Sequence, residues 1–120
     1  MRKPKTFKYA DQWGDEMDVV LLRRAYADGS LAVQMLCRDE DGCWEPYATI
    51  TTNLCDAANQ NASFAYVDTN NMSAVADFLI ENGLAAYTGM TRPSGFCAYP
   101  LYAFTSEFFE TCADSVEEVR

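Results

Sequence analysis

The chain has 120 residues, the size of one domain, and 49% of them are apolar, which is enough for a packed core and excludes a wholly disordered chain. Its 18 acidic and 9 basic side chains give a net charge of -9, which opposes direct binding to nucleic-acid backbones and to anionic membranes. Histidine is absent, so His-based triads, His metal ligands and imidazole proton shuttles are excluded. We predict one domain over 1–120, with frayed ends at 1–5 and 117–120.

The first half of the sequence predicts a meander of antiparallel strands. The candidate strands are apolar, alternating or β-branched runs at 6–9, 17–26, 31–38 and 43–53. Asp28-Gly29 lies between the second and third runs, and Asp41-Gly42 between the third and fourth. Asp-Gly between two such runs indicates a tight hairpin, because both central residues of the turn can adopt positive φ.

The second half predicts helices and aromatic strands. A polar loop at 54–62 and a short strand at 64–67 precede a helix at 72–82, which has cap residues before it and Asn82-Gly83 at its end. Alternating aromatic residues predict a strand at 96–104, and Pro100 indicates an edge position. A last helix begins after Thr105 or Ser106, since apolar residues up to Val119 recur at helical spacing.

These elements together predict an α+β fold. We expect a curved antiparallel sheet of about five strands, with one central helix over 72–82 and a C-terminal helix packed on the sheet. A parallel βαβ core is not expected.

Several short segments carry a resemblance that covers most of the chain. They are Thr6-Phe7-Lys8-Tyr9, the run at 47–54, Asp68-Thr69-Asn70-Asn71, the run at 78–84, Thr88-Gly89, Ser94-Gly95-Phe96-Cys97 and Tyr99-Pro100-Leu101-Tyr102. In these the sequence resembles a family of small uncharacterised bacterial proteins, a domain of unknown function met in gut bacteria and their conjugative or phage-like elements. The resemblance implies a cytosolic bacterial accessory protein of a mobile element. It carries over no catalytic residue.

No constellation in the sequence predicts catalysis, a cofactor or a metal site. The five cysteines are spaced by 6, 12, 42 and 15 residues, which matches no zinc pattern. Asp39-Glu40-Asp41-Gly42 lacks the later Glu of an EF-hand loop, and Cys97 has no His to lower its pKa. We therefore predict a protein that is not an enzyme, with a carboxylate- or metal-dependent enzyme as the alternative.

The cysteines and the first residues also predict a compartment. The charged N-terminal segment has no apolar region typical of a signal peptide, and an odd number of cysteines fits reduced thiols. We expect a cytoplasmic protein that needs no disulfide to fold, and no apolar run is long enough to span a membrane.

Acidic and aromatic side chains are the candidates for binding a partner. Acidic residues share one side of the last predicted helix, and two more stand four apart on the central helix: Glu107, Glu110, Asp114, Glu117, Glu118, Asp77 and Glu81. Tyr99 and Tyr102 belong to an aromatic cluster that serves either as core or as an exposed patch for a protein.

The predicted function is that of a non-enzymatic acidic binding protein. Carboxylates spaced like a line of phosphates favour a nucleic-acid mimic that inhibits a nucleic-acid-binding protein or complex, as anti-CRISPR and anti-restriction proteins do. Two alternatives remain open: acidity that serves only solubility, and a structural homodimer formed through the aromatic strand.

Overall fold

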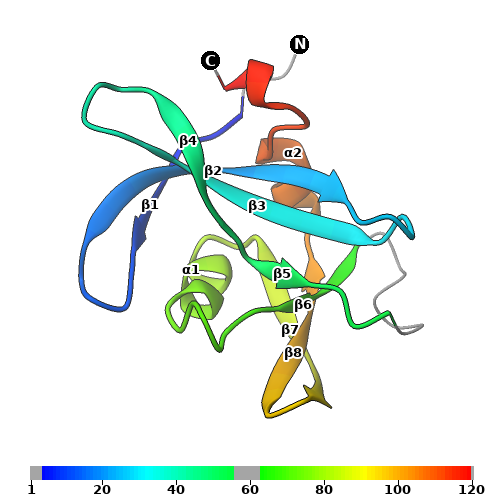
Figure 1. The fold of residues 1–120 in the computed structure, drawn as a ribbon. Coiled ribbons are helices and arrows are strands. Elements are labelled where there is room, and N and C mark those ends of the chain that lie inside the picture. Colours follow the sequence, from blue (N-terminus) through cyan, green and yellow to red (C-terminus); the bar gives the residue numbers. More distant parts are fainter. Residues whose placement is uncertain (1–3, 56–62, 120) are drawn as a thin grey trace.

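A computed structural model describes residues 4–55 and 63–119 (Figure 1). The polar loop predicted at 54–62 lies mostly outside these residues. The elements follow in chain order as β1 (Phe7–Ala10), β2 (Glu16–Ala25), β3 (Leu31–Arg38), β4 (Trp44–Thr49), β5 (Thr51–Thr52), β6 (Phe64–Val67), α1 (Val75–Glu81), β7 (Ala85–Ser94), β8 (Cys97–Phe104), α2 (Ser106–Thr111) and the 3-10 turn η2 (Val116–Glu118). The described chain is thus mostly antiparallel sheet with two short helices.

The strands form two four-stranded sheets, so the prediction of a single curved sheet of about five strands is wrong. The first sheet has the order β1-β2-β3-β4 and the second β5-β6-β8-β7, and every pairing between these strands is antiparallel. The predicted strand at 43–53 is divided at Ile50, which is fully buried. Its N–H donates to the carbonyl of Val33 in β3, and its own carbonyl accepts from the N–H of Asp68, beyond β6. Ile50 is therefore a corner at which one strand passes from one sheet to the other.

The meander over the first sheet is confirmed, and its three turns share one geometry. In the segments 11–15, 26–30 and 39–43, the first residue bonds through its N–H to the carbonyl of the fifth and accepts from the N–H of the glycine in between. The glycines Gly14, Gly29 and Gly42 have φ of 83–86°, whereas their Asp and Trp neighbours do not have positive φ. The turns are thus type I with a glycine bulge, not the two-residue turn expected for Asp-Gly.

The main core lies between the sheets and is closed by the two helices. Phe78 of α1 packs edge-to-face on Phe7 and Tyr9 of β1, with ring centroids 6.0 and 5.2 Å apart. Phe108 of α2 is fully buried and lies 4.9 Å from the ring of Phe104. A second, smaller cluster joins Val20, Leu22 and Ala113 on the other face of β2. Both faces of β2 are therefore covered.

The last predicted helix is shorter than its apolar spacing indicates. It ends at Cys112, whose ψ of 160° is extended. Ala113 then pairs in parallel with Leu22, because β1 covers only the first part of the β2 edge. The N–H of Ala113 donates to the carbonyl of Leu21, and the carbonyl of Ala113 accepts from the N–H of Arg23. Two backbone hydrogen bonds and burial against the second cluster thus replace the expected helical turns.

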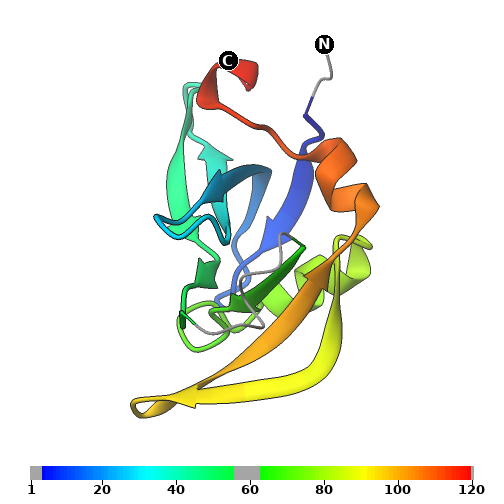
Figure 2. The ribbon, with the colours of Figure 1, turned by 90° about the vertical axis from the view of Figure 1, so that its right-hand side faces the viewer.

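The hairpin β7–β8 extends well beyond the body of the molecule (Figure 2). The sequence predicts only β8 as a strand and a loop before it, but β7 runs from Ala85 to Ser94 beside it. Gly89, with φ of 89°, occupies an irregularity between Tyr87 and Thr91, and Gly95 with φ of 63° opens the tip turn. We call residues 88–100 the arm. Across the described residues, no helix has the length and apolar character that crossing a membrane requires.

Candidate functional site

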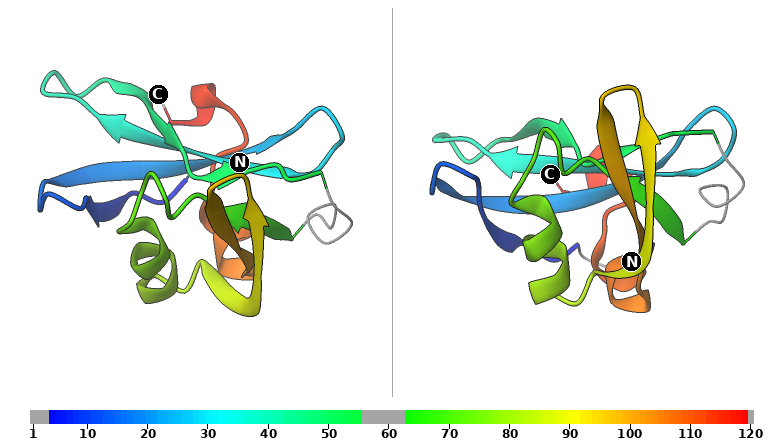
Figure 3. Two further views of the ribbon diagram at one scale, coloured as in Figure 1. Left: turned by 60° about the horizontal axis from the view of Figure 1, so that its bottom comes forward. Right: turned by 90° about the horizontal axis from the view of Figure 1, so that it is seen from below.

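Two acidic turns lie at the same end of the first sheet. In an antiparallel meander, alternate turns return to one end, so the β1–β2 and β3–β4 turns lie on the same side of the molecule (Figure 3), although Figure 1 shows them well apart along that side. Their carboxylates are Asp11, Asp15, Glu16, Asp39, Glu40 and Asp41. Residues nearly thirty positions apart in the sequence thus form one negatively charged end.

Two of these carboxylates hold the turns in shape. Oδ1 of Asp11 accepts from the backbone N–H groups of Trp13 and Asp15, both at 2.9 Å. Oδ1 of Asp39 accepts in the same way from Asp41 at 2.9 Å and from Cys43 at 2.8 Å. The other four side chains of the two turns are exposed. They are therefore available to a partner without loss of turn geometry.

The helix α1 continues this acidic surface. Asp77 and Glu81, the pair expected on the central helix, are exposed and line a hollow of about 360 Å³ together with Glu16 and Lys8. The Lys8 ammonium is hydrogen-bonded to Asp18, which raises the pKa of Lys8 and lowers the pKa of Asp18. We call the eight carboxylates of the two turns and α1 the acidic rim: Asp11, Asp15, Glu16, Asp39, Glu40, Asp41, Asp77 and Glu81.

The acidic residues of the C-terminal region do not form the predicted row. Glu107 and Glu110 are exposed on α2, but the helix ends before Asp114. Asp114 forms an ion pair with Arg23 at 2.8 Å, and Oε1 of Glu118 accepts from the Asp114 backbone N–H. Glu117 lies on η2. The expectation of five carboxylates along one helix is wrong because the chain becomes extended at Cys112.

The two tyrosines predicted to bind a partner have different surroundings. Tyr102 is buried in the core, and its ring lies 5.6 Å from that of Tyr87. Tyr99 is half-buried in the arm. The large apolar side chains that are exposed on the β7–β8 hairpin are instead Tyr87, Met90 and Phe96. Sequence reasoning missed Met90 and Tyr87, and the signal for them is the stretch without acidic residues that follows Asn82.

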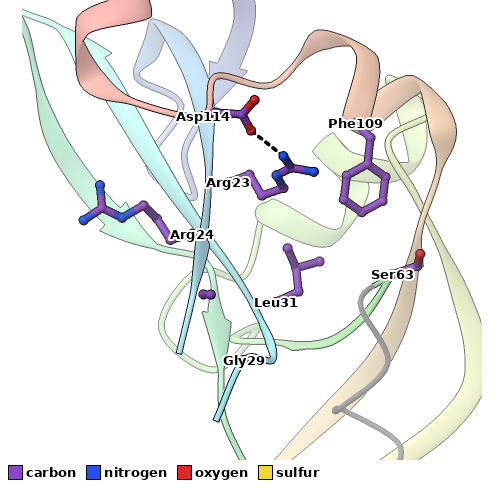
Figure 4. Close-up of a pocket in the computed structure, with 8 residues that line it drawn as sticks. Arg23, Arg24, Gly29, Leu31, Ser63, Phe109 and Asp114 are labelled. Carbon is purple, nitrogen blue, oxygen red and sulfur yellow. Dashed lines mark ion pairs between the residues drawn. The ribbon is translucent and has the colours of Figure 1, made fainter. Parts of the chain in front are cut away.

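A hollow of about 580 Å³ lies between the first sheet and α2 (Figure 4). The guanidinium of Arg23 stands between the Asp114 carboxylate and the Phe109 ring, 5.7 Å from the ring centre. Arg24 points away from Arg23, as consecutive strand residues do. The described carboxylate of this hollow is thus already paired with a cation, and the geometry offers no nucleophile with an adjacent base.

The part of the chain that the structure describes contains no candidate metal site. No group of three or more Cys, Asp or Glu side chains within these residues is placed to hold an ion. The rim carboxylates are consequently spread over a surface rather than converging on a point.

Comparison with known proteins gives one match. Residues 20–120 match the model of the family described as "Domain of unknown function (DUF4313)", and because the match covers most of the chain, the protein belongs to that family. No curated protein matches the sequence. No solved structure matches it.

Proposed function

We propose that this DUF4313 protein is a non-enzymatic binding protein whose acidic rim binds a basic surface of another protein in a bacterial cytoplasm. The observation that supports the proposal is the extent of the rim: two turns and one helix place eight carboxylates on one side of a chain with a net charge of -9. The five free cysteines are compatible with a reducing compartment.

The rim favours binding through charge. Exposed carboxylates of one sign produce a field that accelerates the encounter with a positively charged surface, and this field is screened by salt. Because Asp11 and Asp39 are fixed by backbone hydrogen bonds, the turns present their other carboxylates in a preorganised arrangement. Binding then orders few additional residues.

A nucleic-acid-binding protein or complex is the partner class that fits best. The β1–β2 and β3–β4 turns present carboxylates from two separate strand connections at one end of the first sheet. Carboxylates distributed over a surface in this way can take the place of backbone phosphates on a basic protein surface. On this ground we propose an inhibitor of the anti-restriction or anti-CRISPR type, encoded by a mobile element.

The experiment compares two charge-reversal variants that change the net charge equally. The rim variant combines Asp15→Lys with Glu40→Lys, and the control combines Glu107→Lys with Glu110→Lys on α2. Neither pair includes the carboxylates that hold the turns. Immobilised wild-type and variant proteins are incubated with lysate of the cells that natively encode the chain, then washed with duplex DNA, and retained proteins are identified by mass spectrometry.

We expect basic DNA-binding proteins on the wild type and on the α2 control, released by duplex DNA and by salt, and their loss from the rim variant. Equal loss from both variants would show that net charge alone retains these proteins, which contradicts the proposal. Retained proteins that duplex DNA does not release would contradict the mimic while leaving a protein-binding rim.

A further inference from the structure

The β1–β2 turn carries an exposed tryptophan among its carboxylates. Trp13 is 76% exposed, although tryptophan is highly buried on average in folded proteins. It lies between Asp11 and Asp15 in the sequence, and Glu16 follows at the start of β2. A ring this exposed adds little to the core, so packing within the chain does not explain its position in an acidic turn.

The backbone of the turn holds Trp13 in a defined place. The N–H of Trp13 donates to Oδ1 of Asp11 at 2.9 Å, and the same oxygen accepts from the N–H of Asp15. The N–H of Asp11 donates to the carbonyl of Asp15 at 3.0 Å, and the N–H of Gly14 donates to the carbonyl of Asp11 at 3.0 Å. The turn thus presents its tryptophan and its free carboxylates from a preorganised backbone, so binding a partner orders few groups.

Elsewhere in the chain, an aromatic ring and a carboxylate together hold an arginine. The Arg23 guanidinium lies over the Phe109 ring, 5.7 Å from its centre, and 2.8 Å from the Asp114 carboxylate (Figure 4). The negative face of the ring attracts the cation, and the carboxylate pairs with its charge. Both contacts act on one guanidinium, which is planar and can stack and donate hydrogen bonds at the same time.

A second arginine has the same two kinds of contact. The Arg38 guanidinium lies over the Trp44 ring, 4.6 Å from its centre, and 3.9 Å from the Asp18 carboxylate. Trp13 and the carboxylates beside it supply this combination again, whereas no lysine or arginine among the described residues lies over the Trp13 ring. A guanidinium that completes the arrangement at Trp13 must therefore come from another molecule.

Charge determines the kind of molecule. The turn belongs to the acidic rim, whose field attracts a positively charged surface and repels an acidic one. Of the two basic side chains, arginine stacks on an aromatic face while its donors reach a carboxylate, and lysine is a compact and strongly hydrated point charge. Tryptophan and arginine are also the residues most enriched where a protein interface gains its binding energy.

We propose that the β1–β2 turn is the arginine-binding element of the acidic rim: an arginine of the basic partner protein stacks on Trp13 and pairs with a carboxylate next to it, Asp15 or Glu16. The inference rests on the proposed function, because it names the group of the partner that the rim recognises. The carboxylates of the rim attract any cation, and Trp13 adds the preference for arginine over lysine.

The test compares two peptides that differ only in their basic side chain. One is a short peptide of alternating Gly and Arg, and the other has Lys in place of every Arg, so their charges are equal. The chain has two tryptophans, and their indole N–H signals in a nitrogen–proton correlation spectrum report on Trp13 and Trp44 separately. We expect the arginine peptide to shift the Trp13 signal and not that of Trp44. It should bind about two- to fivefold more tightly than the lysine peptide, as an exposed cation–π contact implies.

Two substitutions of exposed aromatic residues test the role of the ring. Trp13→Leu should lower the affinity for the arginine peptide to about that for the lysine peptide, which it should leave nearly unchanged. Phe96→Leu is the matched control, since Phe96 is fully exposed on the arm, which carries no carboxylate, and both affinities should stay the same. The shift of the Trp13 signal is measured on the wild type and does not depend on how a variant folds.

The outcomes separate this inference from the proposed function. Equal affinity for the two peptides, an arginine preference that Trp13→Leu leaves intact, or no binding of either peptide overturns the arginine site. If both peptides bind equally and Asp15→Lys/Glu40→Lys loses both, the arginine site is wrong while the rim remains a surface that binds by charge. If Trp13 prefers arginine but the rim retains no protein from the lysate, the proposed function is wrong and the arginine contact stands.

Discussion

The hairpins β2–β3 and β7–β8 are both long antiparallel pairs, yet their surroundings are opposite. The faces of β2–β3 are both covered, one by the main core through Leu21 and Met35, the other by the C-terminal segment through Leu22. The outer part of β7–β8 is exposed along β7 and at most half-buried along β8. Backbone pairing is similar in both, so the difference lies in burial, which supplies most of the stability of a sheet.

The comparison separates the side chains that hold the fold from those that are available to partners. The apolar residues of β2 and β3 are accounted for by packing within the chain. Met90 and Phe96 on the arm have no such role, and the arm also lacks the carboxylates that cover the rest of the surface. Apolar side chains that do not stabilise their own chain are the ones to assign to an intermolecular contact.

The largest expected effect is on the free energy of unfolding, when a buried side chain of β2 and an exposed one of the arm are shortened in turn. Leu21→Ala removes a fully buried side chain from the main core and should lower the free energy of unfolding by about 2–5 kcal/mol. Met90→Ala shortens a side chain of comparable size on the arm and should change the free energy of unfolding by less than about 0.5 kcal/mol. Urea denaturation measures both, at a protein concentration low enough that association does not contribute.

Equal destabilisation by the two substitutions would contradict the comparison. It would mean that the arm folds back on the body in solution and that Met90 is a core residue. The m-value provides a check, because a variant that alters only stability shifts the midpoint and leaves the slope unchanged.

The first sheet was predictable because its signals are local. Continuous apolar runs mark β2 and β3, and the turn residues between them are adjacent in sequence, so the strand at 31–38 agrees with β3 and the one at 17–26 is displaced by one residue. The division into two sheets was not predictable, because it depends on Ile50 bonding at once to Val33 and Asp68, which are distant in the sequence. The run at 43–53 contains no residue that breaks a strand at Ile50.

The second half misled sequence reasoning for two reasons. Helical spacing from Phe108 to Val119 predicts a helix, but pairing of Ala113 with the open edge of β2 overrides it. The strand β7 has no alternation to detect, because both of its faces are exposed, and Gly89 and Pro93 resemble loop residues.

The candidate site was predictable only in part. Asp77 and Glu81 were named from their spacing and do line the rim, and the turn at 39–41 was counted as added charge. The position of that turn at the same end of the sheet as Asp11 and Asp15 follows from the meander itself, since alternate turns share an end. The Arg23–Asp114 ion pair, which removes Asp114 from the acidic surface, joins segments that no local pattern relates.

A smaller effect on the free energy of unfolding is expected from removing a tyrosine hydroxyl, and it should differ between buried Tyr9 and exposed Tyr87. The Tyr9 hydroxyl is buried and has no hydrogen-bond partner among the described residues, and burial, with smaller contributions from Tyr47 and Asp11, raises its pKa to about 12. Removing an orphaned hydroxyl relieves a desolvation penalty. Tyr9→Phe should therefore raise the free energy of unfolding at neutral pH by about 1 kcal/mol, and Tyr87→Phe, just before the arm, should change it by less than about 0.5 kcal/mol.

The same substitution changes the response to alkali. The folded protein keeps Tyr9 neutral up to pH about 12, whereas the unfolded chain ionises it near pH 10. Above pH 10 ionisation of Tyr9 stabilises only the unfolded chain, so the free energy of unfolding is unaffected by this group below pH 10 and falls as the pH rises toward 12. Urea midpoints measured from pH 9 to pH 12 should fall less steeply in Tyr9→Phe than in the wild type. Parallel curves for the two proteins would show that the hydroxyl reaches water.

The smallest expected effect is that of a reductant on the melting temperature. All five cysteines are free, and they are spread over both regions: Cys37, Cys43, Cys55 and Cys112 in the body, and Cys97 in the arm. Cys112 is buried, and its thiol donates to the carbonyl of Phe109 at 3.7 Å, so it acts as a small core residue. Burial, followed by the charges of Glu45 and Asp39, raises the pKa of the Cys37 thiol, which keeps it protonated and unreactive.

Melts with and without reductant should therefore coincide. A native disulfide is worth about 2–5 kcal/mol, which in a domain of this size corresponds to a shift on the order of 10 °C. A fall of that size on reduction would mean that two thiols pair in solution and would contradict the proposal of a reducing, cytoplasmic compartment. Substituting Cys97 by Ser then separates the two regions: a shift abolished by Cys97→Ser would show that the bond involves the arm, while a shift that persists would place it in the body.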